Sequence, residues 1–390
     1  MKRWLLLVAA VLALALPLRA VAAPEPIKIG FIFSYSGSDD ETGKEADAAM
    51  AAYMAQHGDT VAGRKVVILR RDDTGLAPEV AKRLATELVI QDHVDVLAGT
   101  ILTPNAIAVA QVSTQSHVPF LIVNAGSAGI PAKNPYTVRF GFTNAQLTQP
   151  LAQWMVRNGI KSAYALYANY GAGVETTTLF ANAFAAAGGT MLGEIGMPMN
   201  SNDFSAYIQR VKDAHPQALF VFHNGSGGIN LMKACGHADL TKAGITVVTV
   251  PEVVRPNDLA TVGDAVLGNI SALDYAPSHD SAMNRAFVQA FQKAHGGERL
   301  PSFDAIAAYD VINAVYRVAT AQNGVMDPDK TIATLRGMSF ESPRGPFKID
   351  PQTREPIENV YIRRVERSGG VLSYREIATF PMVKVPVEQQ

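Results

Sequence analysis

Hydrophobic and polar positions follow two periods along most of the chain. Short, continuously apolar runs alternate with longer segments in which apolar residues recur at helical spacing. The segment 78–91 is an example, because Val80, Leu84 and Leu88 would lie on one face of a helix. Continuously apolar strands separated by amphipathic helices are typical of parallel sheets that are covered on both faces. The pattern therefore predicts an α/β fold.

The predicted elements form two series followed by a different C-terminal third. The first series has strands at 27–33, 66–70, 94–98 and 119–123, with helices at 43–56, 78–91 and from Pro104. The second has strands at 163–167, 190–197, 218–222, 246–250 and 269–273, with helices at 173–187 and 204–214. A turn-rich stretch at 134–144 separates them and suits a crossover. Two long helices, 281–295 and 303–321, then precede short strands and turns.

This order predicts two lobes. A mature chain of this length exceeds the size at which a single hydrophobic core stops growing, roughly 250–300 residues. We expect the first lobe to comprise residues 24–145 with about 276–335. The second lobe would comprise residues 146–275 with about 336–390, so that the C-terminal third packs on both lobes.

The N-terminus has the layout of an export signal. Lys2 and Arg3 precede a continuous apolar run, and residues 20–22 read Ala-Val-Ala, a small-x-small cleavage site. The run is shorter than the about 20 apolar residues that a membrane-spanning helix needs. We therefore expect residues 1–22 to be a signal peptide that is cleaved near Ala22, and the mature protein to be periplasmic.

Composition and motifs argue against several other classes of function. Hydrophobic residues make up 48%, charged residues 18% and the formal net charge is −1, without the basic excess that nucleic-acid binding needs. The single cysteine, Cys235, excludes an internal disulfide. The stretch 37–44 departs from a phosphate loop in its spacing, and 171–173 lacks the third glycine of a dinucleotide loop. Neither a zinc pattern nor a nucleophile–base pattern is present, so we expect no catalysis, metal or cofactor.

Polar loops follow several predicted strands, where open parallel α/β sheets bind ligands. Such loops lie at 34–37, 100–104, 124–127 and 170–173. The pair Thr103-Pro104 suits a helix start, with the Thr103 hydroxyl at the N-cap and Pro104 at the first helical position. The free N–H groups of that helix end would favour a carboxylate. A cap that serves only its own helix is the alternative.

Other strand-end residues have similar alternatives. Ala125, Gly126 and Ser127 combine free backbone groups with a hydroxyl, but the same residues also make simple turns. Tyr170 suits stacking on a ligand or ordinary partial burial. Glu252, after the strand 246–250, would either face the same place or be a solvated loop acid.

These loops resemble the type I periplasmic binding proteins of the leucine/isoleucine/valine-binding group. The resemblance covers essentially the whole mature chain. It rests on the ordered set Ile27-Lys28-Ile29-Gly30, Ser36-Gly37, Gly43, Asp72-Asp73, Gly99, Asn124-Ala125-Gly126-Ser127, Tyr170-Gly171-Ala172-Gly173 and Tyr309-Asp310. It implies two Rossmann-like lobes with parallel sheets joined by a hinge. It also implies a protein that captures a small carboxylate and presents it to the membrane subunits of an ABC importer. We expect this protein to be a monomer.

The resemblance also implies roles for particular residues. Hydroxyls at the positions of Thr103 and Ser127 would clamp the ligand carboxylate, with the Ala125 carbonyl beside them. Tyr170 would cover the ligand, and Glu252 would meet an amino group. Second-lobe contacts would form only as the lobes close, which drives closure. The full set expected to contact the ligand is Tyr35, Thr103, Ala125, Gly126, Ser127, Tyr170, Asn224 and Glu252.

The class of carboxylate stays open. Glu252 favours an amino acid, whereas the glycine-rich stretch 224–228 replaces an aromatic of the amino-acid binders and leaves room for a wider ligand. The stretch 342–348 resembles a subgroup that binds aromatic acids such as hydroxybenzoates. A ligand-sensing module for a membrane receptor is an alternative function, and an exported α/β enzyme is the least favoured.

Overall fold

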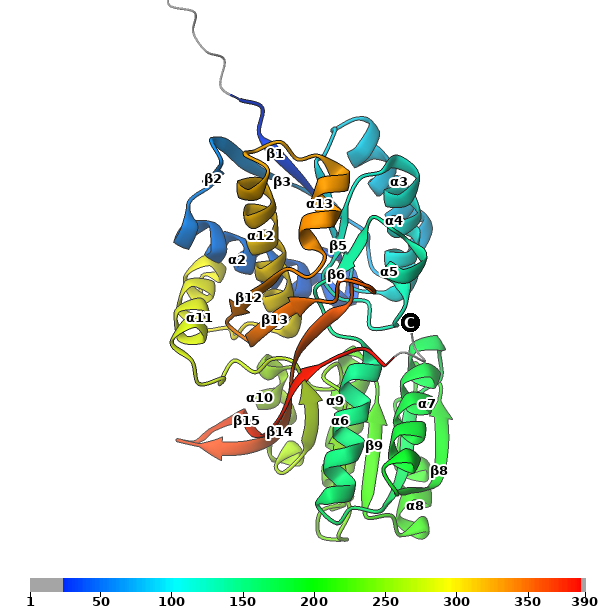
Figure 1. The fold of residues 1–390 in the computed structure, drawn as a ribbon. Coiled ribbons are helices and arrows are strands. Elements are labelled where there is room, and N and C mark those ends of the chain that lie inside the picture. The colour runs from blue at the N-terminus through cyan, green and yellow to red at the C-terminus, as the bar shows by residue number, and fades with distance from the viewer. Residues whose placement is uncertain (1–23, 387–390) are drawn as a thin grey trace, which may run out of the picture.

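The computed structural model describes residues 24–386, which form two lobes lying one above the other (Figure 1). Helices cover sheets in both lobes, so the predicted α/β class is confirmed. The predicted signal peptide, residues 1–22, lies outside the described residues. Between residues 24 and 386, no helix is both long and apolar enough to cross a membrane.

The first lobe contains a six-stranded sheet in the order β2-β3-β1-β4-β5-β6. Its strands are β1 (Ile27–Phe33), β2 (Thr60–Val61), β3 (Arg64–Asp72), β4 (Val96–Gly99), β5 (Phe120–Ile122) and β6 (Thr137–Arg139). All neighbouring pairs are parallel except β2 with β3. β6 lies within the stretch 134–144, which the sequence pattern indicates only as a crossover.

Helices cover both faces of this sheet. Alternation along β1 explains why, since Ile29 and Phe31 belong to one buried cluster and Ile32 to another. The first cluster includes α2 (Asp40–His57), α11 (Ala282–His295) and α12 (Phe303–Ala321), and the second includes α3 (Pro78–Ile90) and α4 (Thr103–Ser116). Each fully buried Ile or Phe contributes about 1.5–3 kcal/mol relative to exposure. The short helices α5 (Ile130–Lys133) and α13 (Pro328–Leu335) complete the lobe.

The second lobe is built on a nine-stranded sheet in the order β12-β13-β14-β11-β10-β9-β7-β8, with β15 on β14. The strands β7 (Ser162–Ala168), β8 (Thr190–Met197), β9 (Ala218–Phe222), β10 (Thr246–Thr249) and β11 (Ile270–Leu273) are parallel. The strands β12 (Ser339–Ser342), β13 (Gly345–Ile349), β14 (Pro356–Ser368) and β15 (Val371–Val383) pair antiparallel. Its helices are α6 (Asn144–Arg157), α7 (Gly171–Ala186), α8 (Ser205–Ala214), α9 (Gly225–His237) and α10 (Leu259–Val262). Three short 3-10 helices complete the order: η1 (Gly37–Asp39), η2 (Pro256–Asp258) and η3 (Gly263–Val266).

The chain passes between the lobes at residues 140–143, at residues 274–281 and along β14 (Figure 1). One end of β14 pairs with β13, whose Phe347 and Ile349 pack in the first lobe's core. The other end pairs with β11 of the second lobe. A single strand thus belongs to both lobes. The division of the chain near residues 145, 276 and 336 stays a prediction.

Candidate ligand-binding site

The loops after β4 and β5 lie side by side because these strands are parallel neighbours. Gly99 ends β4 with φ 117°, and a side chain there would collide with the carbonyl oxygen of Ile32. Glycine is therefore required where the chain turns across the end of β1. The Asn124 N–H donates to the Thr100 carbonyl at 3.2 Å, which joins the two loops.

This arrangement brings Thr103 and Ser127 together, as the sequence predicts. The Thr103 hydroxyl donates to Ser127 Oγ at 3.3 Å and accepts from the Ser127 N–H at 3.4 Å. Thr103 is the first residue of α4, and Leu102, in an extended conformation, is the N-cap residue. The prediction of Thr103 as the N-cap is therefore wrong. Its hydroxyl is directed across the loop to Ser127 instead of onto its own helix.

A buried arginine fixes the loop of Ala125 and Ser127. Arg139 donates to the Ser127 carbonyl at 2.7 Å and to the carbonyl of Ala125, and its Nε lies 2.6 Å from Glu355 Oε2. Ala125 has a φ of 72°, in the left-handed region, so the loop is held in a conformation that alanine rarely adopts. The Ala125 carbonyl, expected beside a ligand, already accepts one hydrogen bond from within the lobe.

Gly126 connects the same loop to the start of the second lobe. Its carbonyl accepts from the Asn144 N–H at 2.8 Å, and a Cβ at this position would lie 2.5 Å from Asn144 Oδ1. Asn144 is the first residue of α6. Gly126 therefore allows a close approach between the two chain segments, whatever else it contacts.

Three predicted residues of the second lobe form another group. β7 and β9 are neighbours, so the Tyr170 hydroxyl reaches Asn224 Oδ1 at 3.1 Å. β10 is the neighbour of β9 on its other side, so Glu252 follows at the same edge of the sheet, and burial, and then the charge of Glu252, raise the pKa of Tyr170. Tyr170 also lies against Phe222, with ring centroids 6.0 Å apart. The strand ends of β7, β9 and β10 thus converge.

Glu252 is not a solvated loop acid. Its Oε2 atom is buried, and no atom of the described residues forms a hydrogen bond with it. Burial raises the pKa of Glu252 to about 7, although Arg255 and Arg363 lower it. A partly protonated carboxyl with a free buried oxygen can accept from, or donate to, a polar group beside it.

The glycine-rich stretch after β9 has a packing role that the sequence does not reveal. A side chain at Gly227 would collide with the His223 ring, and a Cβ at Gly228 would lie 2.8 Å from the Val253 carbonyl oxygen. Only Gly225, with φ 57°, has no atom within 4 Å of an added Cβ. Extra room for a ligand is therefore limited to Gly225.

The two lobes are in contact near both groups. Ser127 Oγ lies 2.5 Å from Glu175 Oε2 on α7, a residue that the sequence pattern does not single out. Arg255 of the second lobe pairs with Asp304 of α12 at 2.9 Å, and Asp304 also accepts from Asn124 at 2.9 Å. The Ser127 loop of the first lobe therefore lies against α7 of the second lobe, and the loop after β10 lies against α12 of the first lobe.

Tyr35 is directed elsewhere. Its hydroxyl donates to Asp47 Oδ1 of α2 at 3.0 Å, and Arg70 of β3 holds the same carboxylate at 2.7 Å. The missing side chain at Gly43 lets the ring fold against α2, since a Cβ there would lie 2.7 Å from the ring. The structure does not bring the Tyr35 hydroxyl to the Thr103–Ser127 pair.

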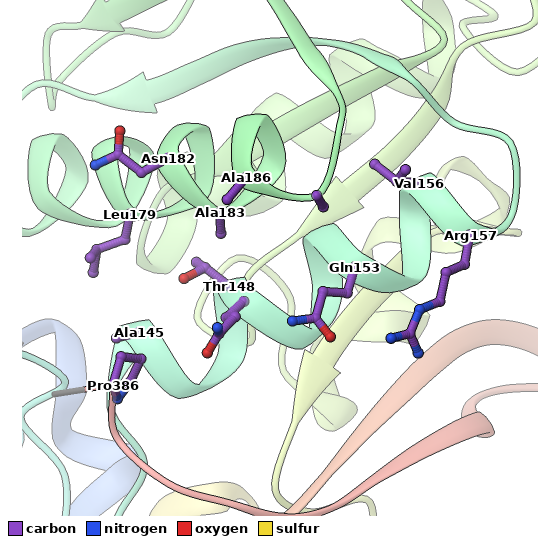
Figure 2. A pocket seen from close by; sticks show the side chains of 12 residues that line it. Ala145, Thr148, Gln153, Val156, Arg157, Leu179, Asn182, Ala183, Ala186 and Pro386 are labelled. Atoms are coloured by element: carbon purple, nitrogen blue, oxygen red, sulfur yellow. The ribbon is translucent and has the colours of Figure 1, made fainter. Parts of the chain in front are cut away.

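A hollow of about 400 Å³ lies apart from these residues, between α6 and α7 (Figure 2). Arg157 lies at one end of this hollow and extends over the Phe380 ring, 5.7 Å from its centroid. The lining consists of Ala145, Thr148, Gln149, Gln153, Val156, Arg157, Leu179, Asn182, Ala183, Ala186, Ala187 and Pro386. It contains none of the eight predicted site residues, and it is a groove between helices instead of a strand-end site.

Two α/β lobes with polar groups at their strand ends, in contact through Ser127 and Glu175, have the architecture of two-lobed solute-binding proteins. The family model described as "Periplasmic binding protein" matches residues 26–370, and the chain belongs to this family. It is a family of solute-binding proteins and not a class of enzymes. The family resemblance seen in the sequence is thereby confirmed.

Individual relatives indicate which kind of solute-binding protein this chain is. The chain is 36% identical over 382 residues to "Leu/Ile/Val-binding protein homolog 6" of Brucella melitensis, covering 97% of both chains. It is 40% identical to a solute-binding protein of an ABC transporter from Rhodopseudomonas palustris BisB5 in complex with 3,4-dihydroxybenzoic acid, with a TM-score of 0.87 over 93% of this chain and 99% of that one. It is 36% identical to an R. palustris ABC transporter solute-binding protein in complex with 4-hydroxybenzoate, with a TM-score of 0.87 over 93% and 98%. The chain is therefore a solute-binding protein of the ABC-transporter type.

Proposed function

We propose that this protein captures a hydroxybenzoate between its two lobes and delivers it to an ABC importer. The observation that carries the proposal is that two solute-binding proteins, 40% and 36% identical over nearly their whole length, hold 3,4-dihydroxybenzoic acid and 4-hydroxybenzoate. A hydroxybenzoate has an anionic end and a neutral hydroxyl end. The junction offers hydroxyl donors on one lobe and a carboxyl and an amide on the other, which supports a ligand of this polarity.

Each end of the ligand has a counterpart. Thr103 and Ser127, beside the N-terminus of α4, bind the carboxylate, with Ala125 and Gly126 shaping that loop. Tyr170 covers the ring, while Asn224 and Glu252 bind the phenolic hydroxyl. Because the second-lobe contacts form only when the lobes meet, they supply the differential affinity that drives closure. The ligand leaves chemically unchanged.

The location and partners follow from the same family. Residues 1–22 are removed as a signal peptide near Ala22, and the mature chain works in the periplasm as a monomer. The protein with its lobes closed on the ligand docks on the membrane subunits of the importer. No cofactor takes part.

A branched-chain amino acid is the second candidate ligand. The relative named as a Leu/Ile/Val-binding protein homolog supports it, as does Glu252, whose free oxygen suits an ammonium group as well as a hydroxyl.

Calorimetry with 4-hydroxybenzoate, 3,4-dihydroxybenzoate, benzoate and leucine tests the proposal. We expect hydroxybenzoates to bind with a Kd of about 1 μM or less, and benzoate to bind roughly tenfold more weakly because it lacks a hydrogen bond worth about 1.4 kcal/mol. Binding of leucine without binding of any aromatic acid would establish the second candidate instead. Recovery of an altered ligand would contradict a transport role without chemistry.

A further inference from the structure

Glu175 places a carboxylate of the protein where the ligand carboxylate is expected. It lies in the second turn of α7, and its Oε2 atom lies 2.5 Å from Ser127 Oγ across the junction. The Ser127 hydroxyl donates this hydrogen bond to the Glu175 side chain. Within residues 24–386, no lysine or arginine forms an ion pair with Glu175. Ser127 is therefore the group that compensates this carboxylate.

A count of hydroxyl protons shows the consequence. Serine and threonine each donate one hydrogen bond from their hydroxyl. Thr103 directs its proton to Ser127 Oγ, and Ser127 directs its proton to Glu175. Both hydroxyls of the Thr103–Ser127 pair are thus committed while Glu175 is in place, and a ligand carboxylate cannot receive the Ser127 proton at the same time.

Neighbouring groups fix both sides of the contact between Ser127 and Glu175. Arg139 holds the carbonyl of Ser127 at 2.7 Å, which fixes the first-lobe loop. A side chain at Gly173 would collide with the Ala168 carbonyl, so glycine lets α7 pack tightly on the end of β7. A ligand carboxylate beside an unmoved Glu175 would also meet like charge in a partly buried place, which is unfavourable.

We propose that Glu175 is a built-in competitor of the ligand: it occupies the carboxylate subsite, bridges the two lobes, and must be displaced when a carboxylate ligand binds. This inference rests on the proposed function, because it takes Thr103 and Ser127 as the carboxylate subsite. Glu175 lowers the affinity for every carboxylate and removes weak ones from competition. It also favours contact between the lobes in the ligand-free protein.

Two variants and one control test this role. Glu175→Ala removes the competing carboxylate, and Glu175→Gln keeps its shape without its charge. Glu194→Gln is the matched control, since Glu194 is an exposed acid on β8 of the same lobe. Calorimetry with 4-hydroxybenzoate should show roughly tenfold tighter binding for Glu175→Ala, the factor that corresponds to about 1.4 kcal/mol. The gain should be smaller for Glu175→Gln and absent for the control.

X-ray scattering separates this inference from the proposed function. Ligand-free Glu175→Ala should have a larger radius of gyration than the wild type, because a bridge between the lobes is gone, while Glu194→Gln should match the wild type. If hydroxybenzoates fail to bind the wild type, the proposed function is wrong. If, in addition, ligand-free Glu175→Ala has the same radius of gyration as the wild type, the contact between the lobes through Glu175 is also overturned. If the wild type binds hydroxybenzoate but Glu175→Ala binds it equally or more weakly, the competitor role alone is overturned.

Discussion

Among single residues, Glu252 offers the sharpest test of how the ligand is recognised, because its buried Oε2 atom has no partner in the described part of the chain. We expect Glu252→Ala to weaken 4-hydroxybenzoate binding roughly tenfold, the effect of losing one hydrogen bond of about 1.4 kcal/mol. Benzoate, which has no hydroxyl to present, should bind the variant and the wild type equally. Calorimetry with both ligands measures the difference, and an equal loss for both would contradict a contact with the hydroxyl. Glu194→Ala is the control.

Some residues of the candidate site could be predicted from the sequence, and others could not. Thr103 pairs with Ser127 in the first lobe, and Tyr170 pairs with Asn224 in the second, because each residue follows a parallel strand and strand order within each sheet places the two loops side by side. Glu175 could not be predicted, because its partner lies 48 residues away along the chain and in the other lobe. Their roles in ligand binding stay predictions.

Among the elements, the segments that cross between the lobes converge on one buried arginine. Arg344, in the turn between β12 and β13, donates to the Phe140 carbonyl at 2.8 Å and pairs with Asp274. It also lies 2.8 Å from Asp310 of α12 and 3.0 Å from Glu358 of β14. Phe140 and Asp274 belong to the two crossing segments, Asp310 belongs to α12, and Glu358 belongs to the strand that both lobes share. One buried guanidinium group therefore connects the segments that cross between the lobes.

Arg344→Met should therefore destabilise the protein strongly. Removing the cation leaves three buried carboxyl groups without a counter-charge, which costs on the order of 3–5 kcal/mol for a broken buried pair. Urea unfolding measures the loss, and Arg364→Met, on an exposed part of β14, should change stability by less than about 1 kcal/mol. Adding Asp310→Asn to Arg344→Met should restore part of the loss. Equal stability of the two single variants would show that the cluster does not hold the hinge.

The sequence predicts a strand correctly where the signal is local, and it misses features that depend on tertiary packing. β1, β8 and β9 are predicted with the observed bounds. β1 and β9 are largely apolar and buried runs, whereas β8 is half-exposed. β6 has only three residues and ends in Arg139, so it has no local signal. The division of β14 between two sheet partners depends on tertiary packing, which no periodicity contains.

For the whole molecule, the hinge cluster links stability to pH. Burial raises the pKa of Asp310 from 3.8 to about 6 even though Arg344 lowers it, and burial also raises the pKa of Glu358. A carboxyl whose pKa is higher in the folded than in the unfolded protein binds more protons when folded. Its contribution is therefore favourable below the unfolded value and is lost as the pH rises through the folded value.

The Asp310→Asn variant isolates this effect from carboxylates such as Asp350, whose pKa the fold lowers and which act in the opposite direction. The unfolding free energy of the wild type, relative to that of the variant, should fall between about pH 4 and about pH 7, by an amount on the order of 2–3 kcal/mol. Urea titrations of both proteins across this range measure the difference. A relative stability that is constant or rises with pH would mean that Asp310 is ionised throughout. The hinge would then carry full charge on this side chain, and the proton that we assign to it would have to be absent.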